Sequence, residues 1–283
     1  MFKNKLVVFT LLFLIIIIAS FLRLYNLGKW PPGLYPDEAM NGTNALQALQ
    51  TSPPTGGFKV FYPDNFGREG LFINIQALVI KSIGKTEPWV LRLPSAIFGI
   101  LTVLGLYFLT KEVLLAENKN WPVQRIALLA SFFLATSFWH INFSRIGFRA
   151  IMAPLLLTWG LYFLLKAWRH NGYIPAIVGG VIYGLGFYTY LAFRATPLLL
   201  LLVAIGYYAS HRIPKKVLWK ISLVFLCATF ITALPIGMYF LQNPADFFGR
   251  TGDVSIFKTA NPLVTVMENI VKQGKNVIKA HLE

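Results

Sequence analysis

Long apolar runs separated by short polar connections are the dominant pattern of this 283-residue sequence. The first run, residues 6–22, contains only two polar side chains, Thr10 and Ser20. Its length lies within the range that an α-helix needs to cross the roughly 30 Å hydrocarbon core of a bilayer. Comparable runs recur as far as about residue 240. We expect about seven transmembrane helices, at residues 6–24, 89–110, 125–142, 150–168, 173–190, 196–210 and 218–241.

One further run, residues 71–83, is short and contains Asn74, Gln76 and Lys81. Its length favours a helix at the membrane interface over a full span. If this segment does not cross, most Lys and Arg side chains of the later loops lie in the cytoplasm, as the positive-inside rule requires. The pattern therefore predicts an all-α, multi-pass protein of the plasma membrane with a cytoplasmic N-terminus. Its first extracytoplasmic loop, residues 25–88, is long and carries juxtamembrane helices.

Composition and charge agree with this class. Hydrophobic residues make up 56% of the chain and charged residues only 13%, against about a quarter in soluble proteins. The net charge of +15 comes mostly from span ends, without the dense basic tract of a nucleic-acid-binding protein. It favours contact with membrane lipids instead. The histidines are scattered and the loop has no Asp-x-Asp spacing, so we expect no metal and no other cofactor.

The first external loop carries most of the polar chemistry. A stretch rich in proline and glycine ends at Pro36, and a helical pattern follows at residues 38–50. Asp37 is therefore expected at the N-cap of this helix. One interpretation is structural, with Asp37 as the cap and Glu38 complementing the helix dipole. The other is catalytic, because a fixed carboxylate at the external membrane surface can accept the proton of an attacking hydroxyl.

A second polar group, Asp64, Arg68 and Glu69, stands just before the interfacial segment. Asp64 fits a turn and Arg68 with Glu69 fits a surface ion pair of little energy. These three side chains fit substrate binding equally well. Gly180 and Gly184 stand four residues apart, a spacing that lets two membrane helices approach closely.

Three arginines, Arg145, Arg149 and Arg194, lie at external ends of predicted spans. Arginine can bind phosphate oxygens through two parallel hydrogen bonds and keeps its charge. The alternative is that each side chain simply reaches to the lipid headgroups. Tyr188 lies near the same external face, where it can either pack at the interface or line a sugar pocket.

The sequence resembles the GT-C-type membrane glycosyltransferases, which include the protein O-mannosyltransferases of glycosyltransferase family 39 and the aminoarabinose transferases. Three features carry the resemblance, in order along the chain. The acidic pair Asp37-Glu38 follows the first span, an interfacial segment begins at Gly70, and Arg-Leu-Pro-Ser at residues 92–95 opens the second span. One departure stands out, because many relatives have a Pro-Pro-Leu element where this chain has Glu69-Gly70-Leu71.

The resemblance implies transfer of a sugar from a polyprenyl-phosphate carrier to an acceptor hydroxyl at the extracytoplasmic face, with inversion at the anomeric carbon. Asp37 and Glu38 would be catalytic, and the acceptor would be a lipid, a glycan or a protein. The relatives are longer, so residues 1–241 are expected to form an amino-terminal membrane module. Residues 242–283 would begin a further external loop.

Two other functions remain open from the residues alone. A transporter or flippase for lipid-linked sugars would place ionisable residues midway through its spans, and the predicted spans have almost none. A non-catalytic subunit of a membrane assembly would tolerate the loss of Asp37.

Overall fold

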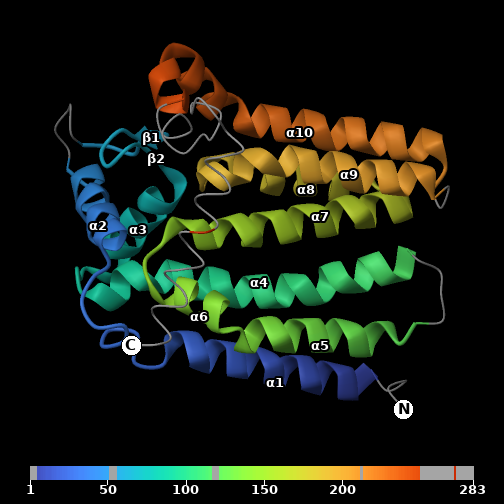
Figure 1. The fold of residues 1–283 in the computed structure, drawn as a ribbon, viewed down its shortest axis with the longest axis horizontal. Helices are drawn as coiled ribbons and strands as arrows, with labels where there is room; N and C mark the ends of the chain where they lie inside the picture. The colour runs from blue at the N-terminus through green and yellow to red at the C-terminus, as the bar shows by residue number, and fades with distance from the viewer. Residues whose placement is uncertain (1–4, 51–55, 117–120, 211–212, 249–270, 272–283) are drawn as a thin grey trace.

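The computed structural model describes residues 5–50, 56–116, 121–210, 213–248 and 271. Long helices run side by side to form a bundle, while α2, α3 and a short β-hairpin gather at one end of it (Figure 1). In chain order the elements are α1 (Lys5–Leu24), α2 (Pro36–Ala48), β1 (Phe61–Tyr62), β2 (Arg68–Glu69), α3 (Leu71–Ile83), α4 (Pro88–Ala116), α5 (Val123–Thr136), α6 (Phe138–Arg145), η1 (Arg149–Ile151), α7 (Met152–His170), α8 (Tyr173–Leu185), η2 (Gly186–Tyr188), η3 (Leu191–Ala195), α9 (Thr196–Ala209) and α10 (Lys215–Gln242).

Within the described residues, five helical stretches are long and apolar enough to cross a membrane. They are Lys5–Leu24, Pro88–Ala116, Arg149–His170, Leu191–Ala209 and Lys215–Gln242. The pair α5 and α6 makes a sixth span if it is counted as one bent helix. The multi-pass, all-α prediction is confirmed. The expected number of seven is not, because the apolar helix at Tyr173–Tyr188 is shorter than a full span.

The predicted span at residues 125–142 is broken. The chain leaves the helical conformation at Ser137, and α5 and α6 meet at an angle of 55°. Carbonyl groups freed by such a break need partners where water is excluded. The fully buried guanidinium of Arg23 on α1 supplies them, donating to the carbonyls of Leu134 at 3.2 Å and Ala135 at 2.9 Å. A third hydrogen bond from this guanidinium reaches His140 Nδ1 at 2.9 Å.

Helices α8 and α10 pack with their backbones close together. A Cβ at Gly180 would lie 2.4 Å from the Phe225 carbonyl oxygen, and one at Gly184 would lie 2.7 Å from Thr232 Cβ. The predicted role of this glycine pair in close helix packing is therefore confirmed. A buried cluster that includes Tyr183 and Phe225 continues the contact between α7, α8 and α10.

The helix α3 has the bounds predicted for the interfacial segment. Its apolar side packs against α2, β1 and the start of α4 through Ile73, Ala77 and Ile80. Figure 1 shows α2 and α3 capping the end of the bundle at which α10 finishes. This cap carries most of the candidate site residues. Of the expected further loop at residues 242–283, residues 249–270 and 272–283 lie outside the described part of the chain.

Candidate active site

Helix α2 begins at Pro36, two residues earlier than its sequence pattern suggests. Its N-cap is Tyr35 and Pro36 occupies the first helical position, so the prediction of Asp37 as N-cap is wrong. The reason is that proline has no N–H to leave unsatisfied and its fixed φ suits the first turn. The Tyr35 N–H is instead bound by Glu38, whose Oε2 lies 3.2 Å away. Both acids remain in the first turn, where they complement the helix dipole.

Glu38 forms a fully buried ion pair with Arg92 of α4. Arg92 Nε lies 2.7 Å from Glu38 Oε1, and Nη2 lies 3.3 Å from Oε2. The same guanidinium donates to the carbonyls of Leu27 at 3.0 Å and Pro31 at 2.9 Å, and to that of Gly33. The pair therefore fixes the path of the chain between α1 and α2. In sequence Arg92 was recognisable only as part of a span-opening motif, because its partner stands 54 positions away.

Asp37 has a more open environment than its neighbour. Its side chain is partly exposed, and Oδ1 accepts a hydrogen bond from Asn65 Nδ2 at 3.0 Å. Asn65, Phe66 and Gly67 have φ values of 51°, 62° and 81° and form the left-handed turn between β1 and β2. Asparagine and glycine tolerate this conformation best. The hairpin turn thus orients the Asp37 carboxylate.

Arg68 joins three segments that are far apart in the sequence. Its buried guanidinium donates to Asn41 Oδ1 at 2.7 Å and to Asn44 Oδ1. Asn44 in turn donates to the exposed carboxylate of Asp64 at 2.9 Å. Asn41 donates to the Gly147 carbonyl at 3.1 Å. Arg68 and Asp64 therefore link α2, the hairpin and the connection after α6.

Glu69 brings together two of the three candidate arginines. Arg149 Nε lies 3.5 Å from Glu69 Oε2, and Arg194 Nη2 lies 3.2 Å from Oε1. Glu69 and Arg149 are buried, at 2% and 1% exposure. Arg149 also stacks over the Tyr190 ring at 5.4 Å. Three buried or partly buried charges from β2, η1 and η3 thus meet at one point, which we call the Glu69 cluster.

Arg194 is held on its other side by aromatic rings. Its guanidinium carbon lies 4.7 Å from the centre of the Phe240 ring and 4.6 Å from that of Phe247. Its Nη1 donates to the Phe247 carbonyl at 3.0 Å. Contacts of a cation with two aromatic faces fix a planar guanidinium without neutralising it. The end of α10 is thereby tied to the Glu69 cluster.

The Glu69 cluster lines a small, nearly filled pocket. Phe61, Phe66, Gly67, Leu191 and Asp246 complete its wall. The open space between these residues is about 10 Å³, which is room for roughly one water molecule. The two arginines of the lining are balanced by the two carboxylates of Glu69 and Asp246, so the formal charge of the pocket is zero.

Aromatic contacts connect the beginning of α2 with the Glu69 cluster. The Tyr35 ring contacts Phe148 at 6.4 Å, and Phe148 contacts Tyr190 at 5.8 Å. Tyr190 is the ring under Arg149. Asp37, which follows Tyr35 by two residues, is therefore on the same side of the molecule as the arginines. The hydrogen bond from Asn65 to Asp37 agrees with this placement, because Phe66, the next residue along the chain, lines the pocket.

Two other predicted residues bind backbone groups. Arg145 donates to the carbonyls of Leu22, Tyr25 and Trp30 at 2.8–2.9 Å, which ties α6 to the end of α1. The Tyr188 hydroxyl donates to the Thr232 carbonyl at 2.7 Å. These contacts stabilise the packing of helices around the site.

Burial raises the pKa of Tyr62, although a hydrogen bond to the Lys59 backbone and the charge of Arg68 oppose this effect. The hydroxyl donates to Asn74 Oδ1 at 2.7 Å and so joins β1 to α3.

Among the described residues, no three His, Cys, Asp or Glu side chains converge on a point where they could hold a metal ion.

Three comparisons with known proteins bear on this site. The family described as dolichyl-phosphate-mannose-protein mannosyltransferase matches residues 71–236. This segment includes Arg92, Arg149 and Arg194 and begins after Asp37 and Glu38. A search of curated proteins finds no match.

Solved structures of similar fold include archaeal oligosaccharyltransferases from Archaeoglobus fulgidus. The apo enzyme aligns with a TM-score of 0.67 at 19% identity, over 83% of this chain and 30% of its own. AglB in complex with an inhibitory peptide and a dolichol-phosphate aligns with a TM-score of 0.65 at 16% identity, over 98% of this chain and 38% of AglB. The enzyme tethered to an acceptor peptide with an NVT sequon also aligns with a TM-score of 0.65, at 15% identity, over 97% of this chain and 38% of the enzyme.

This chain thus spans about a third of the length of those proteins. The likeness to them shows a shared fold. The family match covers more than half of the chain, from the first residue of α3 into α10. The chain belongs to the dolichyl-phosphate-mannose-protein mannosyltransferase family.

Proposed function

We propose that this protein transfers a sugar from a polyprenyl-phosphate carrier to an acceptor hydroxyl at the extracytoplasmic membrane face. The observation that carries the proposal is the convergence of two guanidinium groups in the Glu69 cluster, on the same side of the bundle as the partly exposed carboxylate of Asp37. Membership in a mannosyltransferase family supports the reaction class. The dolichol-phosphate in one structural neighbour supports a lipid-linked donor.

The proposed orientation puts this end of the bundle outside the cell. The helices α2 and α3 and the hairpin all lie at one end, whereas α10 begins at the opposite end with Lys215 and Lys216 (Figure 1). Lysines concentrate on the cytoplasmic side of membrane proteins. A donor phosphate at headgroup depth would then meet the arginines, and its apolar tail would remain in the bilayer.

In the proposed mechanism, Arg149 and Arg194 bind the carrier phosphate. Negative charge grows on this phosphate as its bond to the sugar breaks, and fixed guanidinium groups stabilise such developing charge. Glu69 keeps both side chains in place before the donor arrives. Because the open space is about 10 Å³, the turn at Asn65–Gly67 must move when a sugar binds.

Asp37 is the proposed general base. Its Oδ1 is held by Asn65, which leaves Oδ2 for the acceptor hydroxyl. The acceptor oxygen forms a bond to the anomeric carbon while the bond from that carbon to the phosphate oxygen breaks. The hydroxyl proton passes to Asp37, and polyprenyl phosphate leaves with the bonding electrons. Attack from the face opposite the phosphate inverts the anomeric configuration.

Glu38 has a different proposed role from its neighbour. It is fully buried and its oxygens already bind Arg92 and the Tyr35 N–H. We therefore assign it as a positioning residue that fixes the first turn of α2, and with it the direction of Asp37.

The test is a transfer assay in nanodiscs with polyprenyl-phosphate sugars as donors and with lipid, glycan and peptide acceptors. Asp37→Asn keeps the size of the side chain but removes the base, and we expect at least a 100-fold loss of turnover. Asp64→Asn is the matched control, because Asp64 is exposed and contacts Asn44. Near-normal turnover of Asp37→Asn would defeat the assignment, and equal loss in both variants would attribute the effect to the loop rather than to Asp37.

A further inference from the structure

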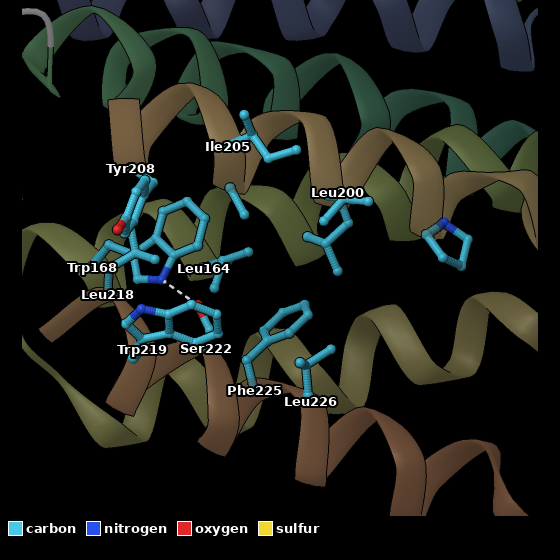
Figure 2. Close-up of a pocket in the computed structure, with 13 residues that line it drawn as sticks. Leu164, Trp168, Leu200, Ile205, Tyr208, Leu218, Trp219, Ser222, Phe225 and Leu226 are labelled. Carbon is cyan, nitrogen blue, oxygen red and sulfur yellow. Dashed lines mark hydrogen bonds between the residues drawn. The ribbon is translucent and has the colours of Figure 1, made fainter. Parts of the chain in front are cut away.

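A groove at the opposite end of the bundle is unrelated to the Glu69 cluster. It lies between α7, α9 and α10 and has a volume of about 360 Å³, which is within the range of ligand pockets. Figure 2 shows its lining, in which aromatic and leucine side chains from the three helices face one another. The buried floor is formed by Leu164, Trp168 and Phe225, all at 2% exposure or less.

The groove has an apolar lining. Its Trp168 indole N–H donates to Ser222 Oγ at 3.1 Å (dashed in Figure 2), so these two polar groups satisfy each other. No residue of α9 is buried, and Leu201 and Ile205 on this helix are 55% and 53% exposed. From Leu218 to Leu226 the α10 wall extends for about 12 Å at 1.5 Å per residue. These features suit an extended hydrocarbon chain.

Positive charge stands at one end of the groove. Lys215 Nζ lies 4.5 Å from the centre of the Tyr208 ring, which lines the groove. Lys216 and Lys220 are exposed on the same two turns of α10. In the part of the chain that the structure describes, these three lysines form no ion pair.

The position of Lys215 and Lys216 is electrostatically unfavourable for an isolated helix. Both stand in the first turn of α10, which contains no acidic residue. The N-terminus of a helix carries partial positive charge, so cations there repel it and an anion stabilises it. Exposed Trp219 and Tyr208 flank this point, and these residue types concentrate at the headgroup level of membranes.

We propose that this groove binds one anionic phospholipid of the leaflet at the Lys215 end of the bundle. One acyl chain lies between α9 and α10, and the phosphate lies at the first turn of α10 between Lys215 and Lys216. The headgroup charge offsets the two lysines and the helix N-terminus. The proposal is independent of the glycosyl-transfer reaction.

Native mass spectrometry of the detergent-purified full chain tests the headgroup half of the proposal, with phosphatidylglycerol and phosphatidylcholine of identical acyl chains. We expect phosphatidylglycerol to bind more tightly. The variant Lys215→Gln/Lys216→Gln should bind it about 25-fold more weakly, about fivefold for each lysine. The control Lys111→Gln/Lys166→Gln removes two charges near the same end of α4 and α7 and should bind as the wild type does.

Two tryptophan variants test the acyl-chain half. Leu201 lines the groove, whereas its neighbour Leu202, 58% exposed, does not. Leu201→Trp should weaken binding of both phospholipids, and Leu202→Trp should leave it unchanged. Equal affinity of the wild type for the two lipids, or equal losses in the two lysine double variants, would overturn the headgroup assignment. Equal behaviour of the two tryptophan variants would overturn the groove as the acyl-chain site.

Discussion

Neutralising the adjacent acids should have different effects: loss of Glu38 should lower the stability of the fold, and loss of Asp37 should lower turnover. Glu38→Gln keeps the side-chain shape but removes the charge that compensates Arg92, and both side chains are 0% exposed. Breaking a buried ion pair by removing one partner costs about 3–5 kcal/mol. Asp37→Asn affects a partly exposed carboxylate with one hydrogen bond at 3.0 Å, so we expect a cost of about 1 kcal/mol or less.

The assay is reversible denaturant unfolding in mixed micelles, followed by circular dichroism. Glu38→Gln should lower the free energy of unfolding by about 3–5 kcal/mol, whereas Asp37→Asn should remain close to the wild type while losing turnover. The double variant Glu38→Gln/Arg92→Gln should cost less than the sum of the two single variants, because their effects are coupled. A Glu38→Gln variant as stable as the wild type would refute a structural role for this pair.

Two further predictions concern helix packing and metal dependence. Gly180→Ala should destabilise the bundle by about 1–3 kcal/mol, because its Cβ would lie 2.4 Å from the Phe225 carbonyl oxygen. Gly237→Ala on α10, with no atom within 4 Å of the new Cβ, should be neutral or slightly stabilising; equal losses in thermal unfolding would contradict the packing argument. Transfer activity should survive treatment with a metal chelator, because Arg149 and Arg194 supply the positive charge that a cation would otherwise provide. Loss of activity that returns on adding Mg²⁺ or Mn²⁺ would contradict this expectation.

The membrane class and several element positions were predictable from the sequence. Long apolar runs predicted α1, α4 and α10. A single segment that crosses the bilayer core must satisfy its backbone hydrogen bonds internally, as an α-helix does. The bounds of α3 were predictable to the residue from its short apolar run. In the structure the helix ends at Gly84, which takes the left-handed conformation typical of helix ends. The Gly180 and Gly184 spacing correctly indicated close packing.

Other features depend on contacts between distant segments. The break at Ser137 is stabilised by Arg23, more than 110 positions earlier, and an apolar run gives no sign of it. Pro36 moved the start of α2 and so displaced Asp37 from the N-cap. A local reading of Glu38 offered a dipole role, whereas its partner Arg92 belongs to the next span.

The identity of the candidate residues was predictable from the sequence, whereas their contacts with one another were not. The arginines at predicted external span ends and the acidic loop residues were identifiable by type and position. The convergence of Arg149 and Arg194 on Glu69, which is 125 positions from Arg194, came only with the fold. The catalytic and binding roles remain predictions for every one of these residues.

The central claim is that the Glu69 cluster binds the carrier phosphate. The most direct test is the affinity of the full chain for a short-chain polyprenyl phosphate, measured by calorimetry in detergent. We predict that Arg149→Gln and Arg194→Gln each weaken binding about 10- to 100-fold, because each removes charge-assisted hydrogen bonds. Asp37→Asn should bind as the wild type does. Unchanged affinity in both arginine variants would contradict the account.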